Sequence, residues 1–199
     1  MNLHLDEAIK NRRSFYGLSK EAVATDEKIK EVIEFAVANA PTAFNSQSGR
    51  VVVLLGSEHD AFWGLTSDTL KELSGDKDFS QTELKMQAFS AGYGTVLFFE
   101  DMNVVKGLQE QFPSYSEAFP GYSLQSSGML QYIVWTSLES LGFGASLQHY
   151  NPLVNAAVQK KWDLPESWEL IAQMPFGKPT APAGEKDVQS LEGRIKVFK

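Results

Sequence analysis

Two short apolar runs, at residues 51–55 and 95–99, constrain the fold of this chain more than any other feature of its sequence. Neither run alternates apolar with polar side chains; the first begins with three valines and the second ends with two phenylalanines. Runs of this kind are typical of strands that are buried on both faces. The sequence therefore predicts two buried strands, with 51–55 central in its sheet, and a third strand at 168–174.

Helical periodicity covers much of the remaining chain. The clearest stripe recurs over residues 29–40, after Thr25, whose hydroxyl suits a helix N-cap. A second strong stripe covers 130–141 and makes Gly142 the residue just past a helix C-terminus. The other segments predicted to be helical are 5–9, 58–91, where the pattern is interrupted and indicates two or three helices, and 104–112.

Composition limits the classes of protein to consider. With 199 residues the chain is long enough for a sizeable core, so we expect 1–199 to form a single domain. Its formal charge of −7 and its scattered basic residues disfavour nucleic acid and acidic membranes as partners. The absence of cysteine removes thiol nucleophiles and thiolate metal sites. Without a signal-peptide pattern or a membrane-spanning apolar run, we expect the protein in the cytoplasm.

The stretch 41–50 concentrates polar side chains with a single charge between a predicted helix and a predicted strand. Asn45 and Gln47 each offer a donor and an acceptor, so together they can match a heterocycle edge that alternates carbonyl and N–H groups. A flavin ring has such an edge. The alternative interpretation is a helix-to-strand loop in which these residues serve only the turn.

Positive charge suited to a phosphate occurs at two other places. Arg12, Arg13 and Ser14 offer two guanidinium groups and a hydroxyl, which can bind a phosphate through charge-assisted, bidentate hydrogen bonds. The alternative is a solvated pair that complements the C-terminal dipole of the preceding helix. Lys178, in a Pro/Gly-rich loop, is a second candidate phosphate cation.

A further stretch, 142–152, is rich in small residues that allow a ligand to approach the backbone closely. His149 lies in it, and a packed or surface histidine is the simpler interpretation, because no second histidine or acid stands near it at metal-ligand spacing. We therefore predict no metal site. The aromatic interval 112–122 either walls a flat ligand or seals a core edge. Lys85, on a predicted helix, is most simply a surface lysine.

Four segments of the sequence occur in the order found in the nitroreductase family: 12–14, 41–50, 142–151 and 176–178. The chain most resembles the small bacterial and fungal branch known as nitroreductase-like or fatty-acid-repression-related proteins, over essentially its whole length. Its most specific strings are Gly-Tyr-Gly-Thr-Val-Leu-Phe-Phe-Glu-Asp, from Gly92, and Leu-Gln-His-Tyr-Asn-Pro, from Leu147.

The resemblance implies an α+β, three-layer fold with a central mixed, mainly antiparallel sheet flanked by helices. It also implies an intertwined homodimer that holds FMN at the subunit interface. NADH or NADPH would reduce the flavin, and a nitroaromatic, quinone or related acceptor would then take its place, in a ping-pong mechanism. The C-terminal segment 187–199, in which apolar and basic residues alternate, is expected to pack on the partner subunit.

Expected roles carry over from the family by position. The residues concerned are Arg12, Arg13, Ser14 and Lys178 at the FMN phosphate and ribityl end, Asn45 and Gln47 at the flavin and its ribityl chain, and Gln148 and His149, through backbone groups, near the redox-active centre of the ring.

The sequence departs from the family near the flavin. Many nitroreductases carry a lysine two residues after the Arg-x-Ser motif, and Tyr16 stands there in this chain. Lys85 resembles another ring-proximal lysine of the family, although the intervening spacing differs, and we include it as a candidate. A cation near the pyrimidine end favours the anionic reduced flavin, so the lack of one would change the flavin potential.

The sequence is also compatible with two other functions. A flavin- or ligand-binding regulatory protein, related to lipid signalling or stress and with incidental turnover, is motivated by the fatty-acid-repression label of the related branch. A metal-free hydrolase using Ser46 or Ser146 with His149 is the weaker alternative, because no supporting motif accompanies these residues.

Overall fold

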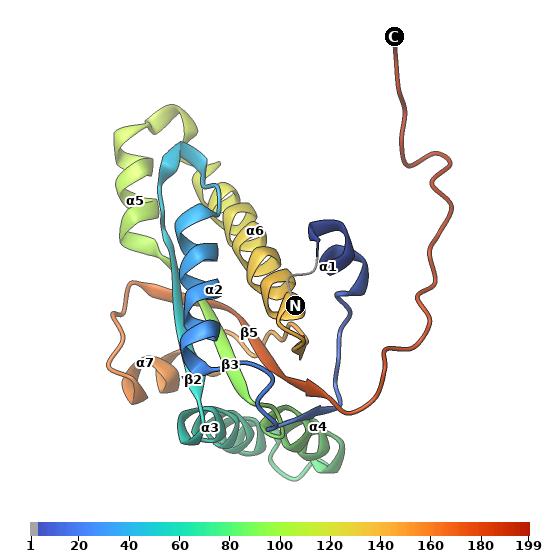
Figure 1. Cartoon of the computed structure of the whole chain (residues 1–199). Helices are drawn as coiled ribbons and strands as arrows, with labels where there is room; N and C mark the ends of the chain where they lie inside the picture. Colours follow the sequence, from blue (N-terminus) through green and yellow to red (C-terminus); the bar gives the residue numbers. More distant parts are fainter. Residues whose placement is uncertain (1–3) are drawn as a thin grey trace.

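The computed structural model describes residues 4–199, which form seven α-helices around one five-stranded sheet (Figure 1). The strands are β1 (Leu18–Ser19), β2 (Gly49–Leu55), β3 (Gly94–Asp101), β4 (Gly144–Ala145) and β5 (Trp168–Pro179). The helices are α1 (Leu5–Asn11), α2 (Asp26–Asn39), α3 (Ser57–Ser74), α4 (Ser80–Ser90), α5 (Met102–Gln111), α6 (Phe119–Ser140) and α7 (Asn155–Lys161). Short 3-10 turns at Ala43–Asn45 and Pro113–Tyr115 precede β2 and α6. Every helix in this part of the chain is too short or too polar to cross a bilayer.

β3 lies in the middle of the sheet. The strand order is β1-β5-β3-β2, and β4 pairs with β5. All of these strand pairs are antiparallel, and a parallel bridge joins Ser14 to Ala145. The expected α+β fold, with a mainly antiparallel sheet between helices, is confirmed.

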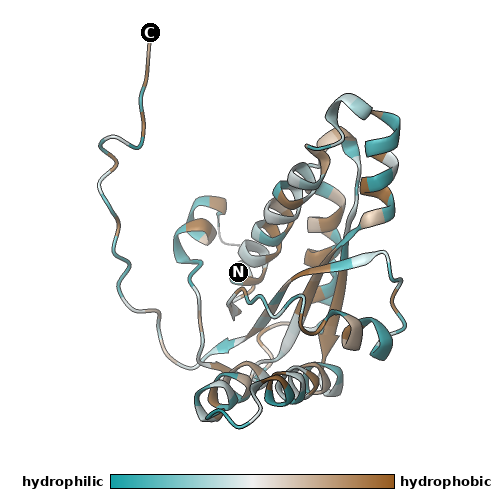
Figure 2. Ribbon diagram, turned by 180° about the vertical axis from the view of Figure 1, so that it is seen from behind, coloured by the Kyte–Doolittle hydropathy of each residue, from teal (hydrophilic) through white to brown (hydrophobic). Residues whose placement is uncertain are grey.

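The alternation of side chains along β3 divides the interior into two cores. Val96 and Phe98 pack against α2 and α6, whereas Leu97 and Phe99 pack against α3, α4 and α7. Figure 2 shows the hydrophobic colour running along the central strands, while the C-terminal segment leaves the body of the protein. Helices therefore cover both faces of the sheet, which explains why the strand sequences are apolar without alternation.

Two predictions about the sheet are wrong. The third strand does not end at 174: β5 continues through Pro179, so Lys178, expected in a loop, lies on a strand and pairs with Ser19. Residues 51–55 do form a strand, but β2 lies at the edge of the sheet instead of at its centre. Val51 and Val53 pack against one core, and Val52 and Leu54 belong to the other, so both faces of β2 have apolar contacts. A continuous apolar run indicates that both faces of a strand are covered. It does not indicate whether both edges of the strand are paired with other strands.

The ends of α2 and α6 follow the sequence signals. The hydroxyl of Thr25 accepts a backbone N–H of the first turn of α2 over 3.2 Å, as an N-cap does. Gly142, with φ of 95°, follows α6 and donates to the carbonyl of Glu139 over 2.9 Å. Phe143 donates to the carbonyl of Leu138 over 3.0 Å. Together these two bonds make a Schellman motif, in which the left-handed position favours glycine.

Two helices differ in extent from the sequence pattern. The interrupted stretch 58–91 contains α3 and α4, and Gly64 lies inside α3 without ending it. α6 begins at Phe119, well before the stripe at 130–141. Pro120 does not prevent this start, because the first turn of a helix needs no hydrogen bond from its N–H groups.

A buried histidine joins α3 and α4 to β3. The indole N–H of Trp63 donates to the Thr95 hydroxyl over 2.9 Å, and that hydroxyl lies 2.8 Å from Nδ1 of His59. Nε2 of His59 lies 3.2 Å from the carbonyl of Ser90. This arrangement suits a neutral ring that accepts at Nδ1 and donates at Nε2. Burial accordingly lowers the pKa of His59, against the opposing effects of the Ser90 carbonyl and Asp60.

We expect His59 to make the protein less stable as the pH falls below about 6.5, the ordinary histidine pKa. Below that pH the unfolded chain binds a proton that the folded ring resists, so the free energy of unfolding falls by at most about 1.4 kcal/mol per pH unit. Urea unfolding of the wild type and of His59→Gln between pH 8 and pH 5 measures this. The free energy of unfolding of the wild type should exceed that of His59→Gln by less and less as the pH falls. A difference between the two proteins that stays constant with pH would contradict the prediction.

Candidate functional site

One group of expected site residues gathers near the C-terminal end of β5. Ser14 forms its bridge with Ala145, and Ala145 pairs with Phe176, two residues before Lys178. The structure therefore brings together three segments that are far apart in the sequence. We call the group at this end of the sheet the cationic end; its members are Arg12, Arg13, Ser14 and Lys178.

The charged side chains of the cationic end have partners within the chain. The guanidinium of Arg12 lies 4.4 Å from the ring centroid of Trp135 on α6. Arg13 donates to two backbone carbonyls just beyond β5, over 2.7 and 3.3 Å. Lys178 forms an ion pair with Glu21 near the surface. Exposed pairs of this kind contribute only about 0–1 kcal/mol, so Lys178 can exchange Glu21 for a phosphate at little cost.

The segment that contains Gln148 and His149 runs along β5. Gln148 exchanges two backbone hydrogen bonds with Gln173, of 2.7 and 2.9 Å, and its side chain donates to the Ser146 hydroxyl over 3.0 Å. The side chain of Gln173, which is buried, accepts the N–H of Tyr150 over 2.7 Å. His149 is exposed. The backbone on either side of His149 is therefore held to β5 at Gln173, five residues before Lys178.

Asn45 and Gln47 lie in the loop that leads from α2 into β2. We call residues 42–48 the amide loop. Both amide side chains are exposed, and the backbone is left-handed at Phe44, Asn45 and Gln47, with φ of 56°, 50° and 49°. Asparagine tolerates this conformation, but for most residues it costs about 1–2 kcal/mol. Such a loop persists only where its surroundings hold it.

Local contacts hold the middle of the amide loop. The backbone N–H of Gln47 donates to the Thr42 hydroxyl over 3.1 Å. The ring of Phe44 packs against Phe112 and Phe119, with centroids 5.0 and 5.2 Å away. The aromatic interval 112–122 therefore does seal one side of the loop, although about half of Phe44, 51 %, stays exposed.

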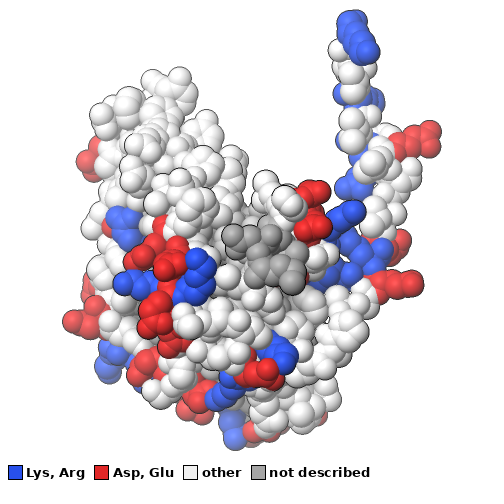
Figure 3. Space-filling model, in the orientation of Figure 1, with Lys and Arg blue, Asp and Glu red and all other residues white. Residues whose placement is uncertain are grey.

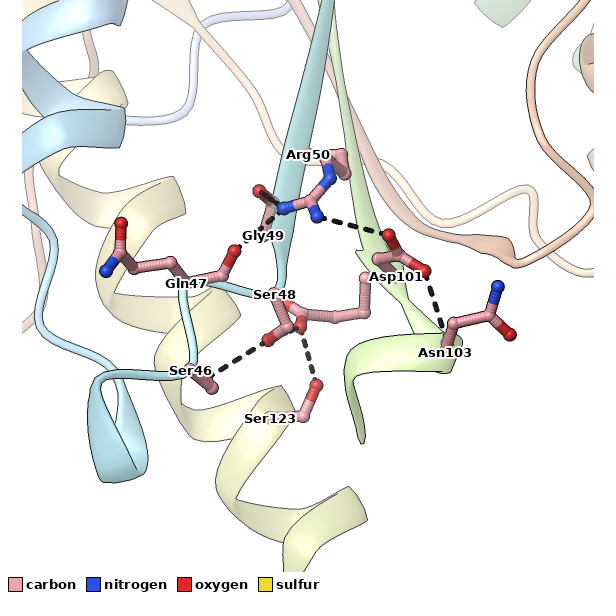
Figure 4. A network of polar contacts seen from close by, with 9 residues as sticks. Ser46, Gln47, Ser48, Gly49, Arg50, Asp101, Asn103 and Ser123 are labelled. Carbon is pink, nitrogen blue, oxygen red and sulfur yellow. Dashed lines mark hydrogen bonds and ion pairs between the residues drawn. The ribbon is translucent and has the colours of Figure 1, made fainter. Parts of the chain in front are cut away.

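A buried acid, Glu100, holds the end of the amide loop. Figure 4 labels its two hydroxyl partners, Ser48 and Ser123. Oε2 of Glu100 accepts hydrogen bonds from the hydroxyls of Ser48, over 2.5 Å, and Ser123, over 2.6 Å. Burial raises the pKa of Glu100, while the two hydroxyl donors and the charge of Arg50 act in the opposite direction. Arg50 forms its own ion pair with Asp101 over 3.1 Å.

Sequence reasoning missed this group. Glu100 follows the apolar run 95–99, where an acid is most simply the residue that ends a strand. In the structure the strand continues through Asp101, and Glu100 is 2 % exposed. The available signal was weak: an acid and two serines, Ser48 and Ser123, that are distant in the sequence.

The amide loop and the cationic end lie at opposite ends of the sheet. Gly49, which follows the loop, pairs with Glu100, whereas Phe176, beside the cationic end, pairs with Gly94. At a rise of about 3.3 Å per residue along β3, these two positions are roughly 20 Å apart. The expected site residues therefore form two separate groups in the chain, which we call the two half-sites.

A cavity of about 630 Å³ lies beside the amide loop, between α2 and the open edge of β2. Its polar lining includes Asn45, Gln47, Arg50 and Glu100, together with the charged side chains of Lys30 and Glu34 on α2. Apolar side chains of α2, β2 and α6 also line it. Its size is within the range of about 300–1,000 Å³ that is typical of small-molecule pockets. The polar ends of the loop residues are therefore accessible to a bound group.

Two other expectations concern Lys85 and the metal ligands. Lys85 is exposed on α4, and within residues 4–199 no hydrogen bond or ion pair joins it to another expected site residue. Its role near a flavin stays a prediction. Over the same residues, no three histidine or acidic side chains come together as metal ligands.

This architecture belongs to a known class of oxidoreductases. The sequence pattern of the Nitroreductase family matches residues 9–178. Nitroreductase FRM2 of Saccharomyces cerevisiae is 36% identical over 182 residues, which cover 90% of each chain. The chain therefore belongs to the nitroreductase family.

Solved structures agree with this assignment. Nitroreductase CinD from Lactococcus lactis, in complex with nicotinic acid, is 45% identical and covers 98% of this chain and 100% of its own, with a TM-score of 0.92. The same protein in complex with 4-nitrophenol gives a TM-score of 0.89 at 45% identity. A chain from Exiguobacterium sibiricum in complex with FMN gives 0.72 at 14% identity, covering 98% of each chain, which shows a shared fold alone.

Proposed function

We propose that this protein is an FMN-dependent oxidoreductase of the cytoplasm that uses NADH or NADPH to reduce small aromatic acceptors, such as nitroaromatics and quinones, by a ping-pong mechanism. The observation that carries the proposal is the presence of a cationic end and an amide loop on a nitroreductase fold. The complexes of CinD with nicotinic acid and 4-nitrophenol support small aromatic ligands as the class to test.

The side chains of both half-sites suit FMN. Arg12, Ser14 and Lys178 offer two cations and a hydroxyl, the set that binds a phosphate dianion well. Asn45 and Gln47 present exposed amides on a loop of fixed backbone, as recognition of a heterocycle edge requires.

The task of the protein itself is then to bind FMN and to orient it. FMN, when bound, would supply the electron transfer, which fits a sequence poor in acid–base and nucleophile motifs. Arg12, Arg13, Ser14 and Lys178 would hold the phosphate and ribityl end. The backbone at Gln148 and His149 would lie beside the redox-active part of the ring, where its attachment to β5 keeps it from moving.

The purified protein, or apoprotein reconstituted with FMN, is expected to be yellow. Its flavin absorbance should be bleached by NADH or NADPH and restored by 4-nitrophenol or a quinone, because one ring face serves donor and acceptor in turn. Absorption spectroscopy measures both steps. A protein that stays colourless and binds no FMN would sink the proposal, and bleaching with slow turnover on every acceptor would favour the regulatory alternative.

We also propose that a complete site needs two copies of the chain. A single flavin held by both half-sites requires them side by side, and within one chain they are roughly 20 Å apart. A symmetric dimer can bring the cationic end of one protomer to the amide loop of its partner, which makes two equivalent sites.

α6 offers a surface suited to such a dimer. Among its 22 residues Glu139 is the one charged side chain. Leu124, Met129 and Tyr132 of this helix are exposed by 54 %, 41 % and 41 %. Figure 3 shows that the upper left part of the body carries few charged side chains, whereas the extended C-terminal segment at the upper right carries several. Exposed, uncharged helix faces are typical of subunit contacts.

The C-terminal segment 187–199 also fits a dimer. It extends away from the body of the protein (Figures 1 and 2). We propose that it packs on the partner subunit, where the open edge of β2 and the adjoining cavity can receive an extended segment. Its exposed apolar side chains, between 59 % and 88 % accessible, are Val188, Leu191, Ile195, Val197 and Phe198.

Complementation between two defective variants tests the shared site. Arg12→Ala with Lys178→Ala removes one half-site, and Asn45→Ala with Gln47→Ala removes the other, so each double variant alone should bind FMN poorly. In a mixed dimer one of the two sites draws both halves from intact residues. Random pairing after co-expression should therefore restore about a quarter of the wild-type FMN content.

Flavin absorbance per chain measures the restored fraction. Each double variant purified alone is the control. If the co-expressed pair holds no more FMN than these controls, the two halves of the site belong to one chain and the proposal of a shared site is wrong.

A further inference from the structure

Glu100 is an unusual occupant of its position. It is 2 % exposed at the end of β3, at the junction of the amide loop, the sheet and α6. Removing a carboxyl group from water is costly, and an apolar residue of similar size would fill the same space without that cost. Packing alone therefore does not explain an acid here.

The hydrogen bonds of Glu100 indicate what the acid does. One oxygen, Oε2, accepts from Ser48 of the amide loop and from Ser123 of α6, so it links the loop to the helix. One turn further along α6, the Ser126 hydroxyl lies 3.4 Å from the backbone N–H of Ala43, at the start of the loop. Because Ser123 and Ser126 are three residues apart, they lie on the same face of α6. The helix thus holds both ends of the loop.

We propose that Glu100 is a positioning residue for the cofactor: its carboxyl group fixes Ser48 against Ser123 and thereby sets the orientation in which Asn45 and Gln47 meet the flavin. This inference rests on the proposed function, since it assigns the amide loop to FMN. It concerns binding geometry, because Glu100 itself acts through Ser48.

Glu100 can be replaced without leaving a nearby charged side chain unpaired. Arg50, on β2, keeps its ion pair with Asp101 when Glu100 is replaced, so no buried cation is left without a partner. Glu100→Gln keeps the shape of the side chain and removes its charge, whereas Glu100→Ala removes both hydrogen bonds. Val134→Ala is the matched control for general destabilisation, because Val134 is fully buried on α6 eight residues after Ser126.

The first measurement is hydrogen exchange of the backbone amides of residues 42–48 in the full chain without FMN. We expect exchange about tenfold faster in Glu100→Gln, and faster still in Glu100→Ala, because a hydrogen bond to a charged acceptor is among the stronger ones. Val134→Ala should lower the thermal unfolding midpoint and leave loop exchange unchanged.

The second measurement is the FMN dissociation constant, from quenching of flavin fluorescence. We expect it to rise about tenfold in Glu100→Gln and to stay at the wild-type value in Val134→Ala. Unchanged loop exchange in Glu100→Ala would overturn the proposal, as would faster exchange with unchanged FMN affinity or an equal effect of Val134→Ala. If the wild type binds no FMN, the proposed function falls, and the exchange data still decide whether Glu100 holds the loop.

Discussion

The antiparallel pairing of β3 with both β2 and β5 determines where the candidate site residues lie. It places the start of β2 at one end of the sheet and the end of β5 at the other, and the two groups of ligand-suited side chains follow these strand ends. No adjustment of loops closes a separation of roughly 20 Å along a rigid strand. A dimer therefore follows from the sheet, if one flavin is to meet both groups. The uncharged face of α6 and the apolar C-terminal segment are the surfaces that such a dimer would cover.

The amide loop is a balance between backbone strain and buried hydrogen bonds. Left-handed conformations at Phe44 and Gln47 cost about 1–2 kcal/mol each. A hydrogen bond to a charged acceptor returns about 1.5–3 kcal/mol, which is of the same order. Loss of the Glu100 contact can therefore release the loop, and the exposed amides would lose the fixed geometry that recognition of a planar ring needs. The rigidity of α6 and β3 thus supports binding at a loop that cannot be rigid alone.

Local signals in the sequence predicted the elements well, and long-range arrangement poorly. Thr25 and Gly142 marked helix ends correctly because caps are local hydrogen-bonding patterns. The apolar run 51–55 predicted a strand but not its edge position, because burial of the faces carries no information about edge pairing. Ser14 and Lys178 were expected in one group, and the structure joins their segments through Ala145 and β5. The buried position of Glu100 could not be predicted, because its partners Ser48 and Ser123 come from other elements and no sequence periodicity links the three residues.

The solution mass of the FMN-loaded protein tests the shared site most directly. Light scattering combined with flavin absorbance gives the molar mass and the flavin content of the same sample. A site built by two copies predicts twice the chain mass of 22.1 kDa and one flavin per chain. A particle of 22.1 kDa that retains a full complement of FMN would contradict it, because a single chain would then hold the cofactor without the second half-site.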